Sequence, residues 1–153
     1  MSSRIVWLAL LLSSLPVGAA AQTTIRVPAD QPTIQAGIGA AAPGDTVLVA
    51  PGTYVERIDF LGKAITVTSE AGPAATVIDG NAGGVVVTFR SGEGPSAVLR
   101  GFTVTNGGGF SGGGVAVLSS SPTIEGNVIS GNRGCDGVGV NVRFPSGVGV
   151  AVN

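Results

Sequence analysis

The stretch Gly114-Val-Ala-Val-Leu-Ser-Ser-Ser-Pro-Thr123 recurs as Gly137-Val-Gly-Val-Asn-Val-Arg-Phe-Pro-Ser146, 23 residues further along the chain. In this alignment glycine falls on glycine, two valines fall on valines and proline falls on proline. A second pair of segments, 102–107 and 127–132, is similar at an offset of 25 residues. A period of 23 to 25 residues with two or three short strands is typical of one coil of a parallel β-helix. The repeat therefore predicts an all-β, right-handed parallel β-helix, a solenoid.

The segments around the repeat are short, β-branched and bounded by glycine, asparagine, aspartate or proline, as strands are. We predict strands at residues 25–27, 46–49, 57–60, 64–68, 76–78, 85–89, 98–105, 114–118, 127–130, 138–142 and 148–152. The gaps between them are too short for the helices of βαβ units, which leaves a β-sandwich or a solenoid. The regular period favours the solenoid, because the hairpin turns of a sandwich do not keep such a register.

One segment departs from the strand pattern and predicts a short helix within residues 30–44. Three apolar residues spaced i, i+4 and i+7 would share one face of this helix, namely Ile34, Ile38 and Ala41. Asp30 or Gln31 could cap its N-terminus, and Pro43-Gly44 would end it. Such a helix would cover the open first coil, as repeat proteins need. We therefore expect an N-terminal cap at residues 22–45 and β-helix coils at residues 46–153.

The N-terminus has the order of parts found in secretory signal peptides. Arg4 precedes the apolar run 5–15, and three alanines at 19–21 follow. The run is too short for a spanning helix, which needs roughly 20 apolar residues. We expect residues 1–21 to be removed after Ala21, leaving a mature chain of 132 residues without a membrane span. That chain would be secreted, periplasmic or held at the cell surface.

Composition limits the functions open to the chain. Of its 153 residues, 11% are charged, the net charge is −1 and none is histidine. This balance excludes charged disordered tails and argues against a nucleic-acid surface. The missing histidine excludes Ser-His-Asp and Cys-His sites and histidine-ligated zinc or copper. Cys135 is the only cysteine, so it cannot form an internal disulfide, and we interpret it as a turn residue.

The sequence of the cap resembles that of a known superfamily. Its residues Pro32-Thr-Ile-Gln-Ala and Ala42-Pro-Gly-Asp-Thr-Val-Leu-Val-Ala-Pro-Gly-Thr-Tyr-Val-Glu56 are similar to the N-terminal cap of the pectin-lyase-like right-handed parallel β-helix proteins. The resemblance covers about residues 24–132 and implies the fold rather than one function. In the pectin methylesterases of this superfamily, coils after the cap carry catalytic glutamines and a Gln-Asp pair. Here the first glutamine position falls on Gly114, and no Gln-Asp pair occurs in the sequence.

Carboxylates and arginines are the residues left for catalysis. A carboxylate pair could serve glycoside hydrolysis, and a carboxylate with an arginine could serve β-elimination. The candidates are Asp59, Asp79, Glu125 and Asp136, with Arg90 or Arg100 as a base or an electrostatic clamp. We predict no catalytic site, metal site or cofactor, and keep three residues as catalytic candidates: Asp79 and Arg100, which the coil register could stack on one face, and Asp136. Calcium is an ion that such carboxylates could bind, although no pattern in the sequence supports a site for it.

Aromatic side chains are the usual platform for sugars, and few remain after removal of the signal peptide. Phe110 and Phe144 lie in glycine- or proline-rich loops and are the candidates for ligand contact. Tyr54 is expected to fasten the cap. Three phenylalanines lie within strand patterns and are expected in the core, namely Phe60, Phe89 and Phe102.

Glycine and asparagine mark the corners between strands. The segment 107–112 matches G-x-G-x-x-G, but a strand rather than a helix follows it, so we interpret it as a coil corner and not as a dinucleotide site. Asn81, Asn106 and Asn132 are 25 and 26 residues apart, and we predict a ladder of asparagines on equivalent corners. Lys63, the only lysine, is assigned to a turn.

At residue 153 the printed sequence stops in mid-coil, since the 23-residue offset places residues 123–130 over residues 146–153. An uncovered coil leaves unpaired backbone groups, so we expect end-to-end self-association. The sequence as a whole indicates an exported, non-catalytic β-helix module that acts as a scaffold, an adhesin or a surface that contacts polysaccharide. The alternative is the N-terminal part of a polysaccharide lyase or pectin esterase-like enzyme whose active coils lie beyond residue 153.

Overall fold

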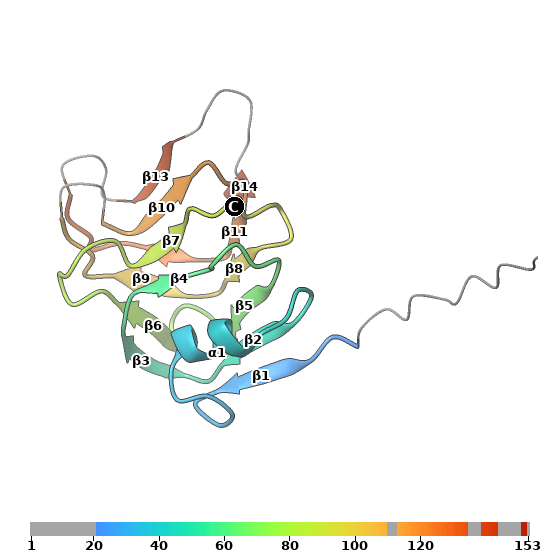
Figure 1. Cartoon of the computed structure of the whole chain (residues 1–153). Helices are drawn as coiled ribbons and strands as arrows, with labels where there is room; N and C mark the ends of the chain where they lie inside the picture. Colours follow the sequence, from blue (N-terminus) through green and yellow to red (C-terminus); the bar gives the residue numbers. More distant parts are fainter. Residues whose placement is uncertain (1–20, 110–112, 135–138, 144–150, 153) are drawn as a thin grey trace, which may run out of the picture.

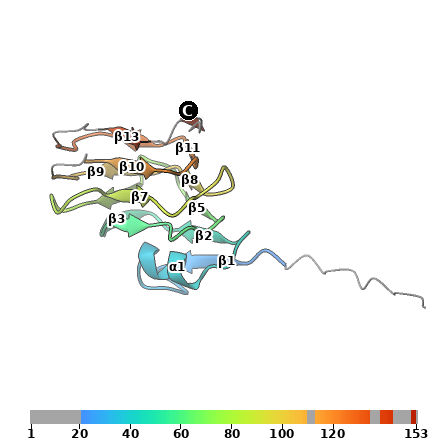
Figure 2. The same cartoon turned by 45° about the horizontal axis from the view of Figure 1, so that its top comes forward.

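The computed structural model describes residues 21–109, 113–134, 139–143, 151 and 152. These residues form three sheets in which every pair of neighbouring strands is parallel, and successive strands of a sheet come from successive coils (Figure 1). Figure 2 shows the coils as stacked layers, with the helix α1 in the end layer beside β1. The predicted parallel β-helix is confirmed, and the sandwich is excluded.

The three sheets are named A, B and C here. Sheet A has six strands in the order β1 (Thr24–Val27), β2 (Thr46–Val49), β5 (Thr66–Ser69), β8 (Val98–Arg100), β11 (Thr123–Glu125) and β14 (Ala151–Val152). Sheet B has four strands in the order β12 (Val128–Ile129), β9 (Thr103–Thr105), β6 (Thr76–Asp79) and β3 (Gly52–Val55). Sheet C has four strands in the order β13 (Val140–Arg143), β10 (Val115–Leu118), β7 (Val87–Phe89) and β4 (Ile58–Asp59).

The core is a column of alternate residues that point into the coils. In β2, for example, Val47 and Val49 are fully buried while Thr46 and Leu48 stay partly exposed. The three phenylalanines expected in the core, Phe60, Phe89 and Phe102, are all 0% exposed, and the rings of Phe60 and Phe89 lie 4.3 Å apart between centroids. Apolar stacking from coil to coil therefore stabilises the solenoid.

The corners explain where strand boundaries differ from the prediction. The segment 98–105 was predicted as one strand, but Gly101, with φ +78°, turns the chain between β8 and β9. The strands β3 and β11 were not predicted, because Pro51-Gly52 and Pro122 next to them are typical of turns. A solenoid tolerates such residues at strand starts, and Gly52 N still donates to Ala75 O over 2.9 Å.

The coil register corrects the offset of 23 residues. Val115 pairs with Val140 and Val117 with Val142, an offset of 25. Thr123 pairs with Ala151, at an offset of 28, rather than with residue 146. Around β13 valine alternates with glycine, and the slip of two residues from 23 to 25 keeps every side chain on its own face of the sheet. At β13 the hydrophobic pattern therefore fixes which residues face inward but not which coil position they occupy.

The predicted cap helix exists as α1 (Ile34–Ala40), and its apolar face is confirmed because Ile34, Ile38 and Ala41 are buried. The predicted N-cap is wrong. Thr33 is the N-cap, since its Oγ1 accepts a hydrogen bond of 3.0 Å from Ala36 N. The Asp30 carboxylate instead accepts a hydrogen bond of 2.7 Å from Arg26 N, so it closes the preceding turn.

Side chains of the next coil hold both ends of α1. The two carboxylate oxygens of Glu56 accept hydrogen bonds of 2.9 Å from the N–H groups of Ile34 and Gln35. At the other end, the Lys63 ammonium donates to three carbonyls, namely Ile38 O at 2.7 Å, Gly39 O at 2.7 Å and Ala41 O at 2.8 Å. An anion at the N-terminus and a cation at the C-terminus both match the helix dipole.

Gln35 joins this helix to the outer edge of sheet C. Its Oε1 accepts from Asp59 N at 2.7 Å and its Nε2 donates to Asp59 O at 3.2 Å, so the side-chain amide takes the place of a neighbouring strand. The Tyr54 hydroxyl donates to Ala50 O over 3.0 Å and lies 3.5 Å from Val27 O of β1, so Tyr54 contacts the cap as expected.

Several sequence-based expectations fall outside the described residues. These are residues 1–20 of the signal peptide, together with Phe110, Cys135, Asp136 and Phe144. The described part of the chain has no helix with the length and apolar character needed to cross a membrane.

Candidate functional site

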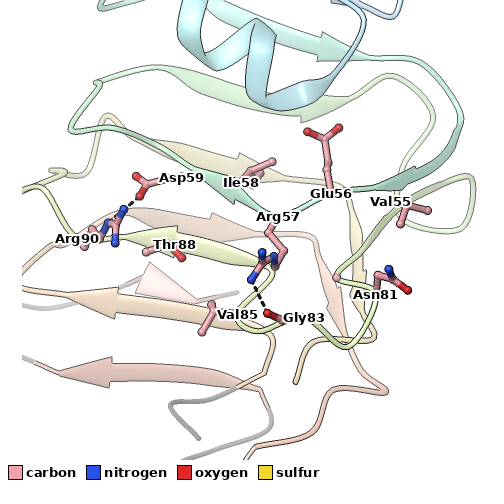
Figure 3. A pocket seen from close by; sticks show the side chains of 11 residues that line it. Val55, Glu56, Arg57, Ile58, Asp59, Asn81, Gly83, Val85, Thr88 and Arg90 are labelled. Carbon is pink, nitrogen blue, oxygen red and sulfur yellow. Dashed lines mark hydrogen bonds and ion pairs between the residues drawn. The ribbon is translucent and has the colours of Figure 1, made fainter. Parts of the chain in front are cut away.

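A groove of about 550 Å³ lies on the outer face of the coils, beside β4 and β7. We call it the arginine groove, because Arg57 and Arg90 lie on either side of Thr88 along it (Figure 3). Its lining residues are Val55, Glu56, Arg57, Ile58, Asp59, Gly80, Asn81, Gly83, Val85, Thr88 and Arg90.

Strand alternation places the polar side chains of the groove on its surface. Ile58 in β4 is 2% exposed and points into the core, so its neighbours Arg57 and Asp59 face outward. In the next coil, Val87 and Phe89 are buried while Thr88 faces outward. Asp59 pairs with Thr88 across the two strands, which brings these outward side chains side by side.

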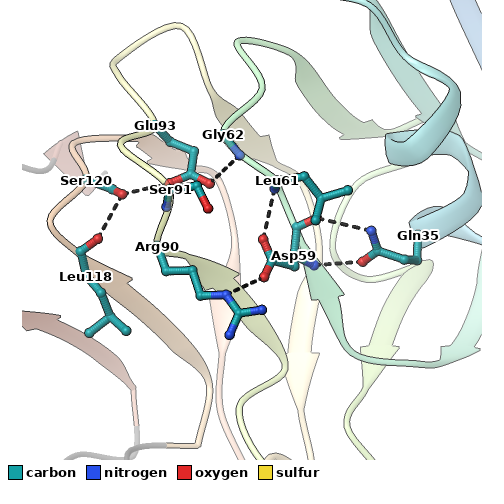
Figure 4. A network of polar contacts seen from close by, with 9 residues as sticks. All are labelled: Gln35, Asp59, Leu61, Gly62, Arg90, Ser91, Glu93, Leu118 and Ser120. Carbon is teal, nitrogen blue, oxygen red and sulfur yellow. Dashed lines mark hydrogen bonds and ion pairs between the residues drawn. The ribbon is translucent and has the colours of Figure 1, made fainter.

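Both carboxylates that line the groove are already engaged. Glu56 binds the N-terminus of α1 through both oxygens. Asp59 accepts a hydrogen bond of 2.9 Å from Leu61 N and forms an ion pair of 2.8 Å with the Nε of Arg90 (Figures 3 and 4). An acid or base catalyst needs a carboxylate oxygen that can reach substrate, and these oxygens are directed at the protein's own donors.

Both arginines keep N–H groups that are not used within the described part of the protein. Arg57 Nη1 donates to Gly83 O, which fixes the guanidinium over the loop that follows β6. Arg90 uses its Nε for Asp59, and its side chain is 62% exposed. Among the residues that the structure describes, the other guanidinium N–H groups of both arginines have no hydrogen-bond partner, nor do the Thr88 hydroxyl and the side-chain amide of Asn81. The groove therefore presents mostly hydrogen-bond donors, which suit the hydroxyl and carboxylate oxygens of a ligand.

Asp79 and Arg100, the other described catalytic candidates, are not among the lining residues of the groove and do not lie together. Asp79 ends β6 in sheet B, where its Oδ1 accepts hydrogen bonds of 2.8 Å from Asn81 N and from Asn106 Nδ2. Arg100 ends β8 in sheet A and forms an ion pair with Glu125 of the next coil. Because the two residues belong to different sheets, the register does not stack Asp79 on Arg100.

The three asparagines of the expected ladder follow β6, β9 and β12, which are neighbouring strands of sheet B. Asn81 and Asn106 have positive φ values of 49° and 55° and are exposed. Asn132 is 7% exposed, and by the strand register it lies opposite Gly107 rather than Asn106. The three side chains therefore share a corner but do not stack on one another.

A second polar cluster, around Glu93, lies at the corner that follows sheet C (Figure 4). This side chain is 2% exposed, and it accepts hydrogen bonds from three coils, namely from Gly62 N at 2.9 Å, Ser91 N at 2.9 Å and the Ser120 hydroxyl at 2.7 Å. Burial raises the pKa of Glu93, but the hydrogen bonds from Ser120 and from backbone N–H groups outweigh it and hold the pKa below its ordinary value. The cluster is a structural clasp, because its oxygens are directed at the protein itself.

Asp45 plays a similar part in the cap. Its carboxylate accepts hydrogen bonds from Thr23 N at 2.8 Å, from the Thr23 hydroxyl at 2.7 Å and from Ala42 N at 2.8 Å. These bonds, with the backbone of Thr23 first, hold the pKa of Asp45 below its ordinary value. Sequence reasoning missed the roles of both Glu93 and Asp45, because each depends on partners that only the coil register brings near.

No group of three or more histidine, cysteine, aspartate or glutamate side chains within the described residues could hold a metal ion. Comparison of the chain with models of protein families, with curated protein sequences and with solved structures finds no match. The groove therefore has to be interpreted from its own chemistry.

Proposed function

We propose that the chain is an exported, non-catalytic β-helix module that contacts polysaccharide through the arginine groove. The observation that supports this most directly is that the acidic side chains of the groove are engaged within the protein, while its donor groups are not. Its carboxylates bind the protein itself, whereas Arg57, Arg90, Asn81 and Thr88 keep donors for a ligand. A surface of this kind can hold a chain of sugars but has no free acid to cleave it.

The chemistry of the groove favours sugars that carry carboxylates. Arginine presents a planar fork of N–H donors that matches a carboxylate, while Thr88 and Asn81 suit hydroxyl groups. Among the described residues, no aromatic side chain lines the groove, so binding would rest on hydrogen bonds and charge rather than on stacking. We therefore expect weak contacts that salt reduces and that a polymer strengthens by engaging several molecules at once.

Two features of the sequence support export of the protein and its membership of a β-helix superfamily. The N-terminal pattern indicates export, and the mature protein is expected to begin at Gln22, which intact-mass analysis of exported material can check. The cap sequence supports membership of the pectin-lyase-like superfamily. The expected end-to-end self-association stays a prediction, to be measured by light scattering.

The test is a binding titration of the mature chain with a polyuronate and with a neutral glucan of similar length. The double variant Arg57→Gln and Arg90→Gln should bind the polyuronate at least about tenfold more weakly, the effect of losing one charge-assisted contact. Arg26→Gln is the matched control, because Arg26 is an exposed arginine on sheet A, away from the groove.

Two outcomes would overturn the proposal. Equal weakening by Arg26→Gln would show a general charge effect rather than a site. Release of unsaturated sugars or of methanol from the polymer, lost in Asp79→Asn, would show an enzyme.

A further inference from the structure

The corner after β9 places an asparagine directly before a glycine. Asn106 is exposed and has a φ of +55°, a conformation that asparagine tolerates better than most residues. Gly107 is buried, and a Cβ added to it would lie 1.7 Å from Gly113 O, so only glycine fits there. The fold therefore requires Gly107 and favours asparagine before it, and this is the only Asn-Gly pair in the sequence.

An Asn-Gly pair can undergo an intramolecular reaction, because glycine has no side chain to hinder its backbone nitrogen. The Gly107 nitrogen gives up its proton to water and attacks Cγ of Asn106, and the bond from Cγ to Nδ2 breaks with loss of ammonia. A cyclic imide results, and water then opens either of its two C–N bonds to leave aspartate or isoaspartate at position 106. The whole reaction exchanges one amide NH₂ for a hydroxyl and needs only water.

In the folded chain, both reacting groups are held in other contacts. The Gly107 N–H donates to Asn132 Oδ1 over 2.8 Å, and Asn132 is itself buried, with its Nδ2 donating to Val104 O over 3.0 Å. The leaving amide is held as well, since Asn106 Nδ2 donates to Asp79 Oδ1 over 2.8 Å. We infer that Asn106 is a latent deamidation site, and that Asn132 of the next coil suppresses the reaction by holding the nucleophilic nitrogen.

The product would change the corner. Aspartate at position 106 loses the Nδ2 donor and places a second carboxylate against Asp79, and like charges at this distance repel. Asp79 also accepts from Asn81 N, and Asn81 lines the arginine groove. If the outer coil opens long enough for Asn106 to react, the aspartate that forms is a permanent change beside the groove. The inference rests on hydrogen bonds within the corner, so it stands or falls independently of polysaccharide binding.

The structure offers a matched pair of variants for the test. Asn127 performs the same task one corner earlier, where its Oδ1 accepts from Phe102 N and its Nδ2 donates to Leu99 O, each over 2.9 Å. Both Asn127→Ala and Asn132→Ala therefore remove a bridge between the same two coils. Only Asn132→Ala frees the Gly107 nitrogen.

The experiment incubates the mature chain, the two variants and a synthetic peptide of residues 103–109 at neutral pH, and follows position 106 by peptide mapping with mass spectrometry. Wild type should react at least about tenfold more slowly than the peptide, and Asn132→Ala should react about tenfold faster than wild type, the effect of one lost hydrogen bond. Asn127→Ala should stay close to wild type at this position.

Wild type reacting as fast as the peptide would overturn the inference, as would equal acceleration by the two variants, which would indicate general loosening of the coils. Should Asn132→Ala fail to fold, hydrogen exchange on wild type decides. A Gly107 amide that exchanges as fast as that of the free peptide contradicts the inference, and one that is protected supports it.

Discussion

Lys63→Met tests the attachment of the cap more sharply than any other single substitution. In the wild type, the Lys63 ammonium donates to three carbonyls at the end of α1, over 2.7 to 2.8 Å. Methionine keeps the apolar stem of the side chain, so the substitution removes the charge and the hydrogen bonds but little packing. The helix has only seven residues, too few to be stable without such contacts.

The magnitude follows from the partners of the ammonium. One hydrogen bond to a charged group contributes about 1.5–3 kcal/mol, and a favourable charge at a helix end adds about 0.3–1 kcal/mol. The three bonds do not add fully, because Lys63 and Gly39 are partly open to solvent and water replaces some of what is lost. We expect the free energy of unfolding to fall by about 2–3 kcal/mol, a large part of the stability of an ordinary domain.

Urea unfolding of the mature chain, followed by circular dichroism, measures this change. With a slope of about 1–3 kcal/mol per molar, the midpoint should fall by about 1 M or more. Arg26→Met is the control, because the exposed Arg26 side chain forms no hydrogen bond or ion pair with the described residues, and it should change stability by less than about 0.5 kcal/mol. A Lys63→Met protein that unfolds within about 0.5 kcal/mol of the wild type would refute this reasoning.

Two further substitutions test buried polar groups. Thr76 is fully buried and its hydroxyl has no hydrogen-bond partner within the described part of the chain, so Thr76→Val should raise the free energy of unfolding by about 1 kcal/mol in the same urea assay; a loss of stability would mean that the hydroxyl is satisfied. Burial raises the pKa of Glu93, but hydrogen bonds hold it below the ordinary 4.5, so the carboxylate stabilises the fold above that pH and this contribution is lost as the pH falls below it. Glu93→Gln should therefore be less stable at neutral pH, because its amide cannot accept all three bonds, and should show a weaker dependence on acid, measured as melting temperature against pH. Equal acid dependence in both proteins would assign the effect to other groups.

The fold could be predicted from the sequence because its signal is local and repeated. Short β-branched segments between glycine corners identify strands wherever they stand, and the apolar face of Ile34 and Ile38 identifies the cap helix. The exact register could not be predicted. In the Gly-Val alternation near the end, the pairing of Val115 with residue 138 or with Val140 buries the same face, so the energy difference lies in the corners rather than in the strands.

The contacts that hold the cap and the groove could not be predicted, because each joins residues of different coils. Lys63 was assigned to a turn, and its position is indeed a corner, but its partners are carbonyls 22 to 25 residues earlier in the chain. The sequence alone does not distinguish Glu56 from a solvated residue, but the coil register places its carboxylate at the N-terminus of the helix. The glycines after β6, by contrast, predicted a corner, but they did not indicate that Arg57 would bind the carbonyl of Gly83.

The arginine groove is proposed to bind sugar chains that carry carboxylates. The most direct measurement is nuclear magnetic resonance titration of the ¹⁵N-labelled mature chain with a short oligouronate, observing backbone amides and arginine Nε–H signals together. We expect the signals of Arg57, Arg90, Asn81 and Thr88 to shift in a saturable manner, while those of Arg26 and Arg100 on sheet A stay unchanged. Shifts confined to sheet A, or the absence of saturable shifts around Thr88, would contradict it.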